Sequence, residues 1–263
     1  MINLTKEEQL QVDKITSKIS LEKDKQVLGE HVVNLSKCMV DLSKKSSVDL
    51  CGKVARVVVA LDYSGSMSSL YRNGTIQETL NRLVPLGLSF DDNGALDVFL
   101  FENGYRKFPE LTLKNYADYK TAIIDKSGYS MGGTNYSPVI RSIVYGDNDA
   151  GKTGVFSGLF GRNKQTVPSD EMTYVIFITD GEPSDTTATD DLIRKTSTTN
   201  TFIQFIGIGD CSFKYLKHLD DLTGRAIDNT GFSCLNNLQK ISDTELYTMM
   251  LEEFAGWIKA KNL

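Results

Sequence analysis

Hydrophobic residues follow two different patterns along this chain. Short runs rich in β-branched residues occur at 54–61, 173–179 and 201–208, and they predict strands that are buried on both faces of a sheet. Between these runs, apolar residues recur at spacings of three and four, which is typical of helices with one buried face. Because strands and helices alternate, we expect an α/β, Rossmann-like fold with a mostly parallel central sheet and helices on both faces.

The remaining elements follow from the same patterns and from turn residues. Two strands at 95–101 and 104–108 should form a hairpin through Asn103-Gly104, because this pair tolerates the positive φ of a tight turn. Further helices are expected near 75–90, 115–124, 137–146, 187–197, 212–222 and 242–259. Residues 146–171 are rich in Gly, Ser, Asn and Lys, which predicts a long mobile loop.

The first fifty residues predict a helical extension. Thr5 and Glu8 have the spacing of a capping box, and Gly29 is expected to break the helical region into two helices. The second helix carries an apolar stripe at spacings of three and four: Val32, Leu35, Met39 and Leu42. Either this stripe covers the chain's own domain, or it contacts a partner or a second copy of the chain.

These patterns divide the chain into a helical extension at 1–50 and one domain at 51–263. The length of 263 residues suits a single α/β domain with a small appendage, and the hydrophobic content of 40% is ordinary for a globular protein. No apolar run is long enough to span a membrane, and the start of the chain does not resemble a signal peptide. We therefore expect a cytoplasmic protein.

Cysteine spacing and net charge exclude further classes. The 4 cysteines show no Cys-x-x-Cys spacing, so neither a disulfide nor a zinc site is expected. The net charge of -5 makes nucleic acid an unlikely partner. The 2 histidines, His31 and His218, have no activated Ser or Cys motif beside them, and we expect both to be ordinary structural residues.

Oxygen-bearing side chains follow the predicted strands. Asp62, Ser64 and Ser66 come directly after the first strand, Asp180 follows the strand at 173–179, and Thr134 lies in a Gly-Gly-Thr loop. Loops at the carboxyl ends of parallel strands meet at one edge of a sheet, where such sheets bind ligands. Asp-x-Ser-x-Ser alone is also common in turns and helix caps. Together the five residues predict a site for a hard divalent cation.

This set of residues resembles the metal-ion-dependent adhesion site (MIDAS) of von Willebrand factor A (VWA) domains. That site has the pattern Asp-x-Ser-x-Ser, then a distant Thr, then a distant Asp. The segments at 62–67, 71–77 and 132–138 are similar to the TerF-like branch, which is associated with tellurium-resistance operons. The resemblance covers about 54–257. It departs from TerF in one respect, because residues 1–50 are too few and too helical for the TerD-type domain that precedes the A domain there.

The resemblance implies a role for each site residue. Ser64, Ser66 and Thr134 would bind Mg²⁺, or alternatively Mn²⁺ or Ca²⁺, while Asp62 and Asp180 would hold water and orient the serines. Because hydroxyls are neutral, an ion held by them would attract an Asp or Glu side chain of a protein partner. The implied function is reversible protein binding in a bacterial tellurite or toxic-cation stress response, without catalysis.

Aromatic and apolar residues beside the ligands allow two interpretations. They could form a rim that excludes water around the partner's carboxylate, or they could pack in the core. The residues in question are Tyr63, Met67, Tyr71 and Tyr136.

An enzymatic function is the alternative: a metal-dependent phosphatase that uses Asp62, or an NTPase that uses Lys152. Phosphatases of the haloacid-dehalogenase type need a second acid two positions after the nucleophile, where this chain has Ser64. Lys152 lies in a segment, 146–153, that matches the P-loop pattern, but the segment before it predicts a helix instead of a strand. Asp91-Asp92-Asn93-Gly94 lacks the spaced ligands of a calcium loop and is expected to be a turn.

Overall fold

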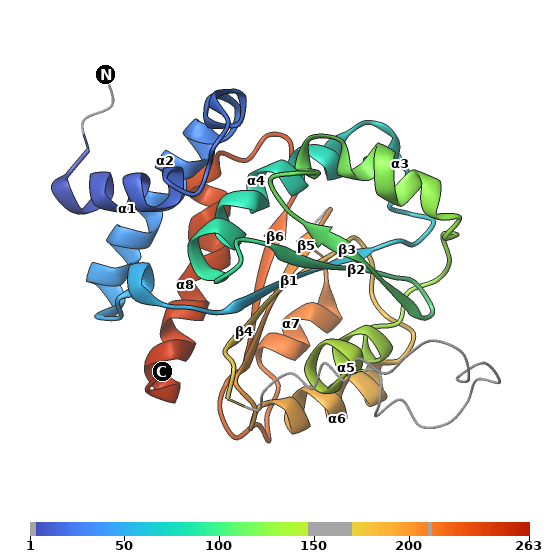
Figure 1. Cartoon of the computed structure of the whole chain (residues 1–263). Helices are drawn as coiled ribbons and strands as arrows, with labels where there is room; N and C mark the ends of the chain where they lie inside the picture. The colour runs from blue at the N-terminus through green and yellow to red at the C-terminus, as the bar shows by residue number, and fades with distance from the viewer. Residues whose placement is uncertain (1–3, 147–169, 210–211) are drawn as a thin grey trace.

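A six-stranded sheet forms the centre of the computed structural model, which describes residues 4–146, 170–209 and 212–263 (Figure 1). The strands are β1 (Arg56–Asp62), β2 (Leu96–Phe101), β3 (Tyr105–Leu111), β4 (Thr173–Thr179), β5 (Thr201–Ile208) and β6 (Thr230–Leu235). Their order in the sheet is β3-β2-β1-β4-β5-β6. The β2–β3 hairpin is antiparallel, and the other described pairs are parallel. The predicted fold class is confirmed.

Helices cover both faces of the sheet (Figure 1). They are α1 (Lys6–Thr16), α2 (Glu22–Ser46), α3 (Ser68–Arg72), α4 (Thr75–Phe90), α5 (Ser137–Tyr145), α6 (Thr186–Thr196), α7 (Lys214–Asp220) and α8 (Asp243–Lys261). Val57 and Val59 of β1 pack with α1, α2, α4 and α8, whereas Val58 and Ala60 pack with α5, α6 and α7. This alternation explains why β1 is a continuous hydrophobic run, because both faces of the strand are buried.

The N-terminal helices belong to the same core as the sheet. α2 packs along α8, and its apolar stripe is almost fully buried, with Val32 1% exposed and Leu35 and Met39 0% exposed. The stripe therefore covers the chain's own domain. The predicted break at Gly29 is wrong, because α2 runs unbroken from Glu22 to Ser46 and the chain turns before it. A helix glycine costs about 1 kcal/mol, and burial of Leu28 and Val32 on either side of Gly29 outweighs this cost.

Several other expectations need correction. The single helix expected at 115–124 is three short helical segments instead, of 3-10 type at Tyr116–Asp118 and Asp125–Ser127 and of π type at Lys120–Ile124. β6 was not predicted. The expectation that the cysteines form no disulfide is also wrong, because Cys234 is disulfide-bonded. Disulfide formation depends on the distance between two cysteines in the fold, which spacing along the chain does not reveal.

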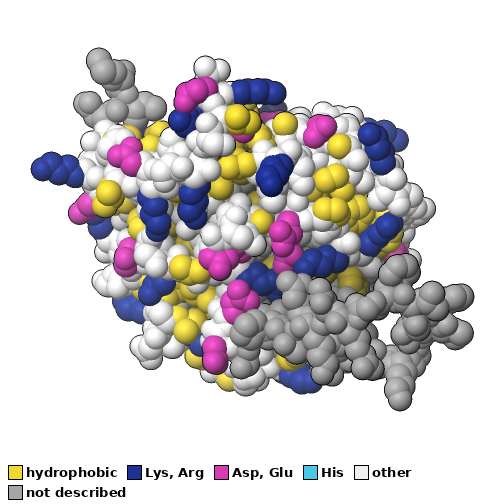
Figure 2. Space-filling view, in the orientation of Figure 1, with side chains coloured by type: hydrophobic (Ala, Val, Ile, Leu, Met, Phe, Trp, Pro, Cys, Tyr) yellow, Lys and Arg dark blue, Asp and Glu magenta, His cyan; other side chains and the backbone are white. Residues whose placement is uncertain are grey.

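Two surface properties bear on the partners of this chain. On the face drawn in Figure 2, basic and acidic side chains are interspersed, unlike the basic stripe of a nucleic-acid-binding surface. Among the described residues, no helix has both the length and the apolar character that crossing a membrane requires.

The loop expected at 146–171 falls mostly outside the described residues, and so does Lys152.

Candidate metal centre

Three loops meet at the carboxyl end of β1. They are the β1 loop (63–67), the β4 loop (180–185) and the glycine loop (128–136). A backbone bridge joins Ser64 to Gly132, where the Gly65 amide donates to the Gly132 carbonyl at 3.2 Å and the Gly132 amide donates to the Tyr63 carbonyl at 3.2 Å. The glycine loop therefore lies directly beside the Asp-x-Ser-x-Ser segment.

Ser66 links the side chains of two of these loops. Its hydroxyl lies 3.0 Å from the Ser64 hydroxyl and donates a 2.7 Å hydrogen bond to Asp180 Oδ1. Asp62 lies beneath, fully buried, with Oδ1 accepting from the Ser64 amide at 2.8 Å. Its Oδ2 accepts from the Thr179 hydroxyl at 2.6 Å. Four of the predicted site residues thus form one continuous hydrogen-bonded group.

Thr134, the fifth predicted residue, lies two positions after the Gly132 bridge and is half-buried. Its carbonyl accepts from the Ser184 amide of the β4 loop at 2.9 Å. The next amide, that of Asn135, donates to the Glu102 carbonyl at 2.8 Å. These bonds fix the main chain of Thr134 between the β4 loop and the β2–β3 turn.

The two glycines of the glycine loop pack closely against the side chains of the β2–β3 turn. A Cβ atom at Gly132 would lie 2.5 Å from Glu102 Oε2, and one at Gly133 would collide with Asn103 Oδ1. Asn135 also donates to the Asn103 carbonyl at 3.0 Å. A side chain at either glycine would therefore displace the side-chain end of Glu102 or Asn103.

The two carboxylates are destabilised by their surroundings. Burial raises the pKa of Asp62 to about 6, against the lowering effect of hydrogen bonds from Thr179 and Ser64, and the charge of Asp180 adds to the rise. Burial also raises the pKa of Asp180. None of the main contributions to either pKa comes from a lysine or arginine. A site with buried anionic oxygens and no compensating cation of its own fits a bound metal ion.

The donor set itself indicates which kind of ion fits. The predicted ligands are oxygens, three of them neutral hydroxyls, and this chemistry suits hard cations. Among the described residues there is no group of three or more His, Cys, Asp or Glu that could hold a metal. A thiolate or imidazole site is therefore not what these residues build.

Three acidic or hydroxyl residues that hold the loops in place were not singled out from the sequence. Thr179 bonds Asp62, as described above, and Asp185 accepts from the amides of Tyr136 and Ser137 at 2.9 and 2.8 Å. Glu182 accepts from the amides of Lys214 and Tyr215 at 2.6 and 2.9 Å, at the start of α7. Asp185 directly precedes α6, a capping position that could have drawn attention to it.

Of the two interpretations of the aromatic and apolar residues beside the ligands, the structure supports core packing and not a rim around the metal. Tyr63 is 9% exposed, Tyr71 is 3% exposed, and Met67 and Tyr136 are 0% exposed. The Tyr71 hydroxyl donates to the Asp62 carbonyl at 3.0 Å, and the Tyr136 hydroxyl donates to the Gly181 carbonyl at 2.5 Å. These side chains support the site loops from below.

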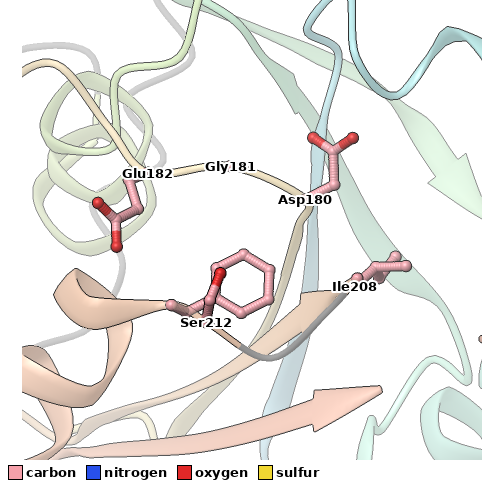
Figure 3. A pocket seen from close by; sticks show the side chains of 7 residues that line it. Asp180, Gly181, Glu182, Ile208 and Ser212 are labelled. Atoms are coloured by element: carbon pink, nitrogen blue, oxygen red, sulfur yellow. The ribbon is translucent and has the colours of Figure 1, made fainter. Parts of the chain in front are cut away.

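A pocket opens beside Asp180 (Figure 3). It has a volume of about 410 Å³, and its lining residues are Asp180, Gly181, Glu182, Ile208, Gly209, Ser212 and Phe213. Figure 3 shows the carboxylates of Asp180 and Glu182 pointing in different directions, so they do not form a carboxylate pair. The pocket extends the site from the β4 loop towards the end of β5.

The alternative sites have structural roles. Asp62 is 0% exposed with both oxygens engaged, which does not suit a nucleophile. His31 bonds Asp243 at 2.5 Å, and His218 bonds Asp190 at 2.8 Å. The segment at 91–94 is a turn, as expected, with Gly94 at φ 73°.

A sequence model of the family vWA-TerF-like, described as the vWA found in the TerF C terminus, matches residues 54–263. The chain belongs to this family. Over 228 residues it is 32% identical to YcbR of Bacillus subtilis (strain 168), which covers 84% of this chain and 86% of YcbR.

Solved structures support the fold alone. Proximal thread matrix protein 1 from the mussel byssus superposes with a TM-score of 0.51 at 20% identity, covering 78% of this chain and 49% of that protein. A variant of the PilB minor pilin from Streptococcus sanguinis superposes with a TM-score of 0.50 at 12% identity, covering 82% of this chain and 65% of the pilin. The chain therefore spans about half the length of the mussel protein.

Proposed function

We propose that this VWA-type chain binds a divalent cation through the hydroxyls of Ser64, Ser66 and Thr134, with Asp62 and Asp180 orienting them. The observation that carries the proposal is the contact set around Ser66, whose hydroxyl lies 3.0 Å from that of Ser64 and 2.7 Å from Asp180 Oδ1. Asp62 beneath it has a raised pKa and no basic partner among its main influences. Membership of the vWA-TerF-like family supports the same assignment.

The cation that suits these ligands best is Mg²⁺, with Mn²⁺ or Ca²⁺ as alternatives. Hydroxyl oxygens are hard ligands without charge, and Mg²⁺ keeps several of its waters when few carboxylates bind it. Asp62 accepts hydrogen bonds from the Ser64 amide and the Thr179 hydroxyl, so we assign it the role of holding the Ser64 segment in place. Asp180 fixes the Ser66 hydroxyl in the same way.

The function we assign is reversible binding of a protein partner that offers an Asp or Glu side chain. When bound, the ion supplies a positive centre that a partner's carboxylate can approach. Ser66 is exposed, so the hydroxyl end of the group is accessible to a partner, whereas Asp62 is fully buried. The name TerF in the family description supports a setting in bacterial tellurite or toxic-cation stress, and we place the protein in the cytoplasm.

A catalytic function is less well supported. A phosphatase nucleophile must reach its substrate, and the two oxygens of Asp62 are held by an amide and a hydroxyl inside the protein. Hydrolysis of p-nitrophenyl phosphate by the Mg²⁺-loaded chain, lost in Asp62→Asn, would favour the enzyme over the binding module.

The proposal is tested by capturing partners on the immobilised chain from a bacterial cell extract. One capture contains Mg²⁺ and a matched capture contains chelator. We expect one or more proteins to be retained only with Mg²⁺, and to be lost with Thr134→Ala but kept with Ser69→Ala, an exposed serine of α3 outside the site. Equal retention in chelator would contradict the proposal.

A further inference from the structure

β6 forms an edge of the sheet, and its middle residues, Phe232 to Cys234, are half-buried (Figure 1). The Asn229 carbonyl accepts from the Ile203 amide at 3.0 Å, and the Leu235 carbonyl accepts from the Gly209 amide at 2.9 Å. The main-chain groups of Asn229, Leu235 and the alternate residues between them therefore face β5. Main-chain groups alternate sides along a strand, and those of Thr230 and Phe232 therefore point outward. An outward-facing row of this kind can pair with another extended chain.

Acidic side chains surround this edge from both faces of the sheet. We call Asp220, Asp228 and Glu253 the edge cluster. Asp220 ends α7, Glu253 comes from α8, and both accept a hydrogen bond from the Phe232 amide. Asp228 Oδ1 accepts from the Thr230 amide at 3.4 Å. Two carboxylates from opposite faces therefore share one amide at the centre of the strand.

The edge cluster carries more negative charge than its neighbours neutralise. Burial is the largest cause that raises the pKa of Glu253 to about 7. The next causes are the negative charges of Asp220, Asp228 and Glu252. Burial and the charges of Asp228 and Asp221 likewise raise the pKa of Asp220 to about 6. Arg225 is the one cation named among these influences, and it is paired with Asp228 at 2.5 Å.

A buried acceptor without a donor lies beside the cluster. Gln204 is 0% exposed, and its Oε1 has no hydrogen-bond partner. Oε1 lies 2.6 Å from the point where a Cβ atom on Gly231 would be, and Glu253 Oε2 lies 2.8 Å from the same point. Two acceptors thus converge over Gly231, and the one on Gln204 has no donor. This arrangement is suited to a group that is rich in donors and positively charged.

A recess continues along the same edge. It has a volume of about 650 Å³ and lies between the end of β6 and α8, with a lining that includes Leu235, Ile241 and Met249. Phe232 and Leu235 are three positions apart, which corresponds to about 10 Å along a strand. An extended segment lying on β6 could therefore reach the edge cluster and the recess together.

We propose that the outer edge of β6 is a docking site for an extended, basic segment of a protein partner. An Arg or Lys of the segment takes the carboxylates of Asp220 and Glu253 and the Oε1 of Gln204. A main-chain amide of the segment donates to the outward-facing Phe232 carbonyl, because the Phe232 amide is taken by the two carboxylates, and an apolar side chain enters the recess. Charge complementarity selects this occupant, because main-chain pairing provides affinity while the side-chain sites provide specificity. The site uses none of the proposed metal ligands.

The test uses the full chain and three fluorescein-labelled nine-residue peptides that alternate valine with arginine, glutamine or glutamate, measured by fluorescence anisotropy. We expect the arginine peptide to bind and the glutamate peptide not to bind. Glu253→Gln combined with Asp220→Asn should weaken binding of the arginine peptide at least about tenfold, since hydrogen bonds to charged groups are the strongest ones lost. Glu252→Gln, a neighbouring exposed carboxylate that pairs with Lys45, is the matched control and should leave binding within about twofold.

A structural readout keeps the test independent of folding defects. In ¹⁵N spectra of the unsubstituted chain, the arginine peptide should shift the amide of Phe232, and thermal melting checks that each variant is folded. The proposal is overturned by equal weakening in Glu252→Gln, by unchanged affinity in the double variant, or by a Phe232 amide that does not move. It is also overturned if Mg²⁺ or Ca²⁺ alone moves that amide, which would indicate a cation site, or if sedimentation shows that a second copy of the chain occupies the edge.

Discussion

Replacing Asp243 with Asn should strongly destabilise the protein, because Asp243 neutralises a buried arginine. Arg82 Nε donates to Asp243 Oδ1 at 2.7 Å, and the side chains of the two residues are 6% and 9% exposed. His31 of α2 bonds the other carboxylate oxygen at 2.5 Å. Burial alone would raise the pKa of Asp243, but the hydrogen bond and charge of His31 and the charge of Arg82 hold that pKa below its usual value.

The size of the destabilisation depends on the hydrogen bonds that Arg82 retains in the variant. Breaking a buried ion pair by removing one partner costs about 3–5 kcal/mol. Arg82 retains hydrogen bonds to the carbonyls of Leu238 and Ile241 at 3.0 Å each, so we expect the lower end of that range. At roughly 2–4 °C per kcal/mol for a chain of this size, the melting temperature should fall by about 6–12 °C.

Urea unfolding followed by circular dichroism measures this loss directly. The matched control is Asp191→Asn, because Asp191 pairs with Arg194 at 3.4 Å on the surface, where the two side chains are 75% and 37% exposed. The control should cost no more than about 1 kcal/mol. A loss below about 1 kcal/mol for Asp243→Asn would refute the argument that this buried pair joins α2, α4 and α8.

Three further predictions concern other parts of the molecule. The pKa of Glu253 is raised to about 7, so its stabilising contribution is complete below its unfolded pKa of about 4.3 and is lost as pH rises through about 7. The urea concentration at the unfolding midpoint should therefore decrease from acidic to alkaline pH, and it should decrease less in Glu253→Gln. Gly132→Ala should cost about 1 kcal/mol in urea unfolding, at the low end for overpacking, because its Cβ would displace the flexible end of Glu102, 2.5 Å away, whereas Gly65→Ala has open space and should be nearly neutral; equal costs would contradict this. Lys152→Ala should be silent in calorimetry with ATP, and micromolar ATP binding lost in that variant would revive the NTPase alternative.

The sequence predicted the centre of the sheet well for a physical reason. β1, β4 and β5 are buried on both faces, so most of their positions are apolar and each strand has a recognisable hydrophobic run. β6 lies at the edge and contains Gly231 and Ser233, and its middle residues are half-exposed. Such a strand lacks the hydrophobic run or the strict alternation by which strands are recognised.

Tertiary packing decided the other differences. Gly29 does not end a helix, because Leu28 and Val32 are anchored against the rest of the molecule. Tyr63 and Met67 flank the predicted ligands in the sequence, yet they point into the core, and only the three-dimensional packing reveals this. The sequence could indicate that Asp62, Ser64, Ser66 and Asp180 lie together, because they follow strand ends whose positions were clear, and their role in a metal site stays a prediction. The residues that hold them, such as Thr179 and Asp185, act through contacts with distant segments.

The central claim is that the hydroxyls of Ser64, Ser66 and Thr134 bind a divalent cation. Calorimetric titration of Mg²⁺ into the chain, into Ser66→Ala and into Ser69→Ala tests it most directly, because both substitutions remove an exposed serine hydroxyl a few positions apart. We predict one binding site in the unsubstituted chain and in Ser69→Ala, and loss of that binding in Ser66→Ala while its melting temperature without metal stays unchanged. Mg²⁺ affinity in Ser66→Ala equal to that of the unsubstituted chain would contradict the assignment.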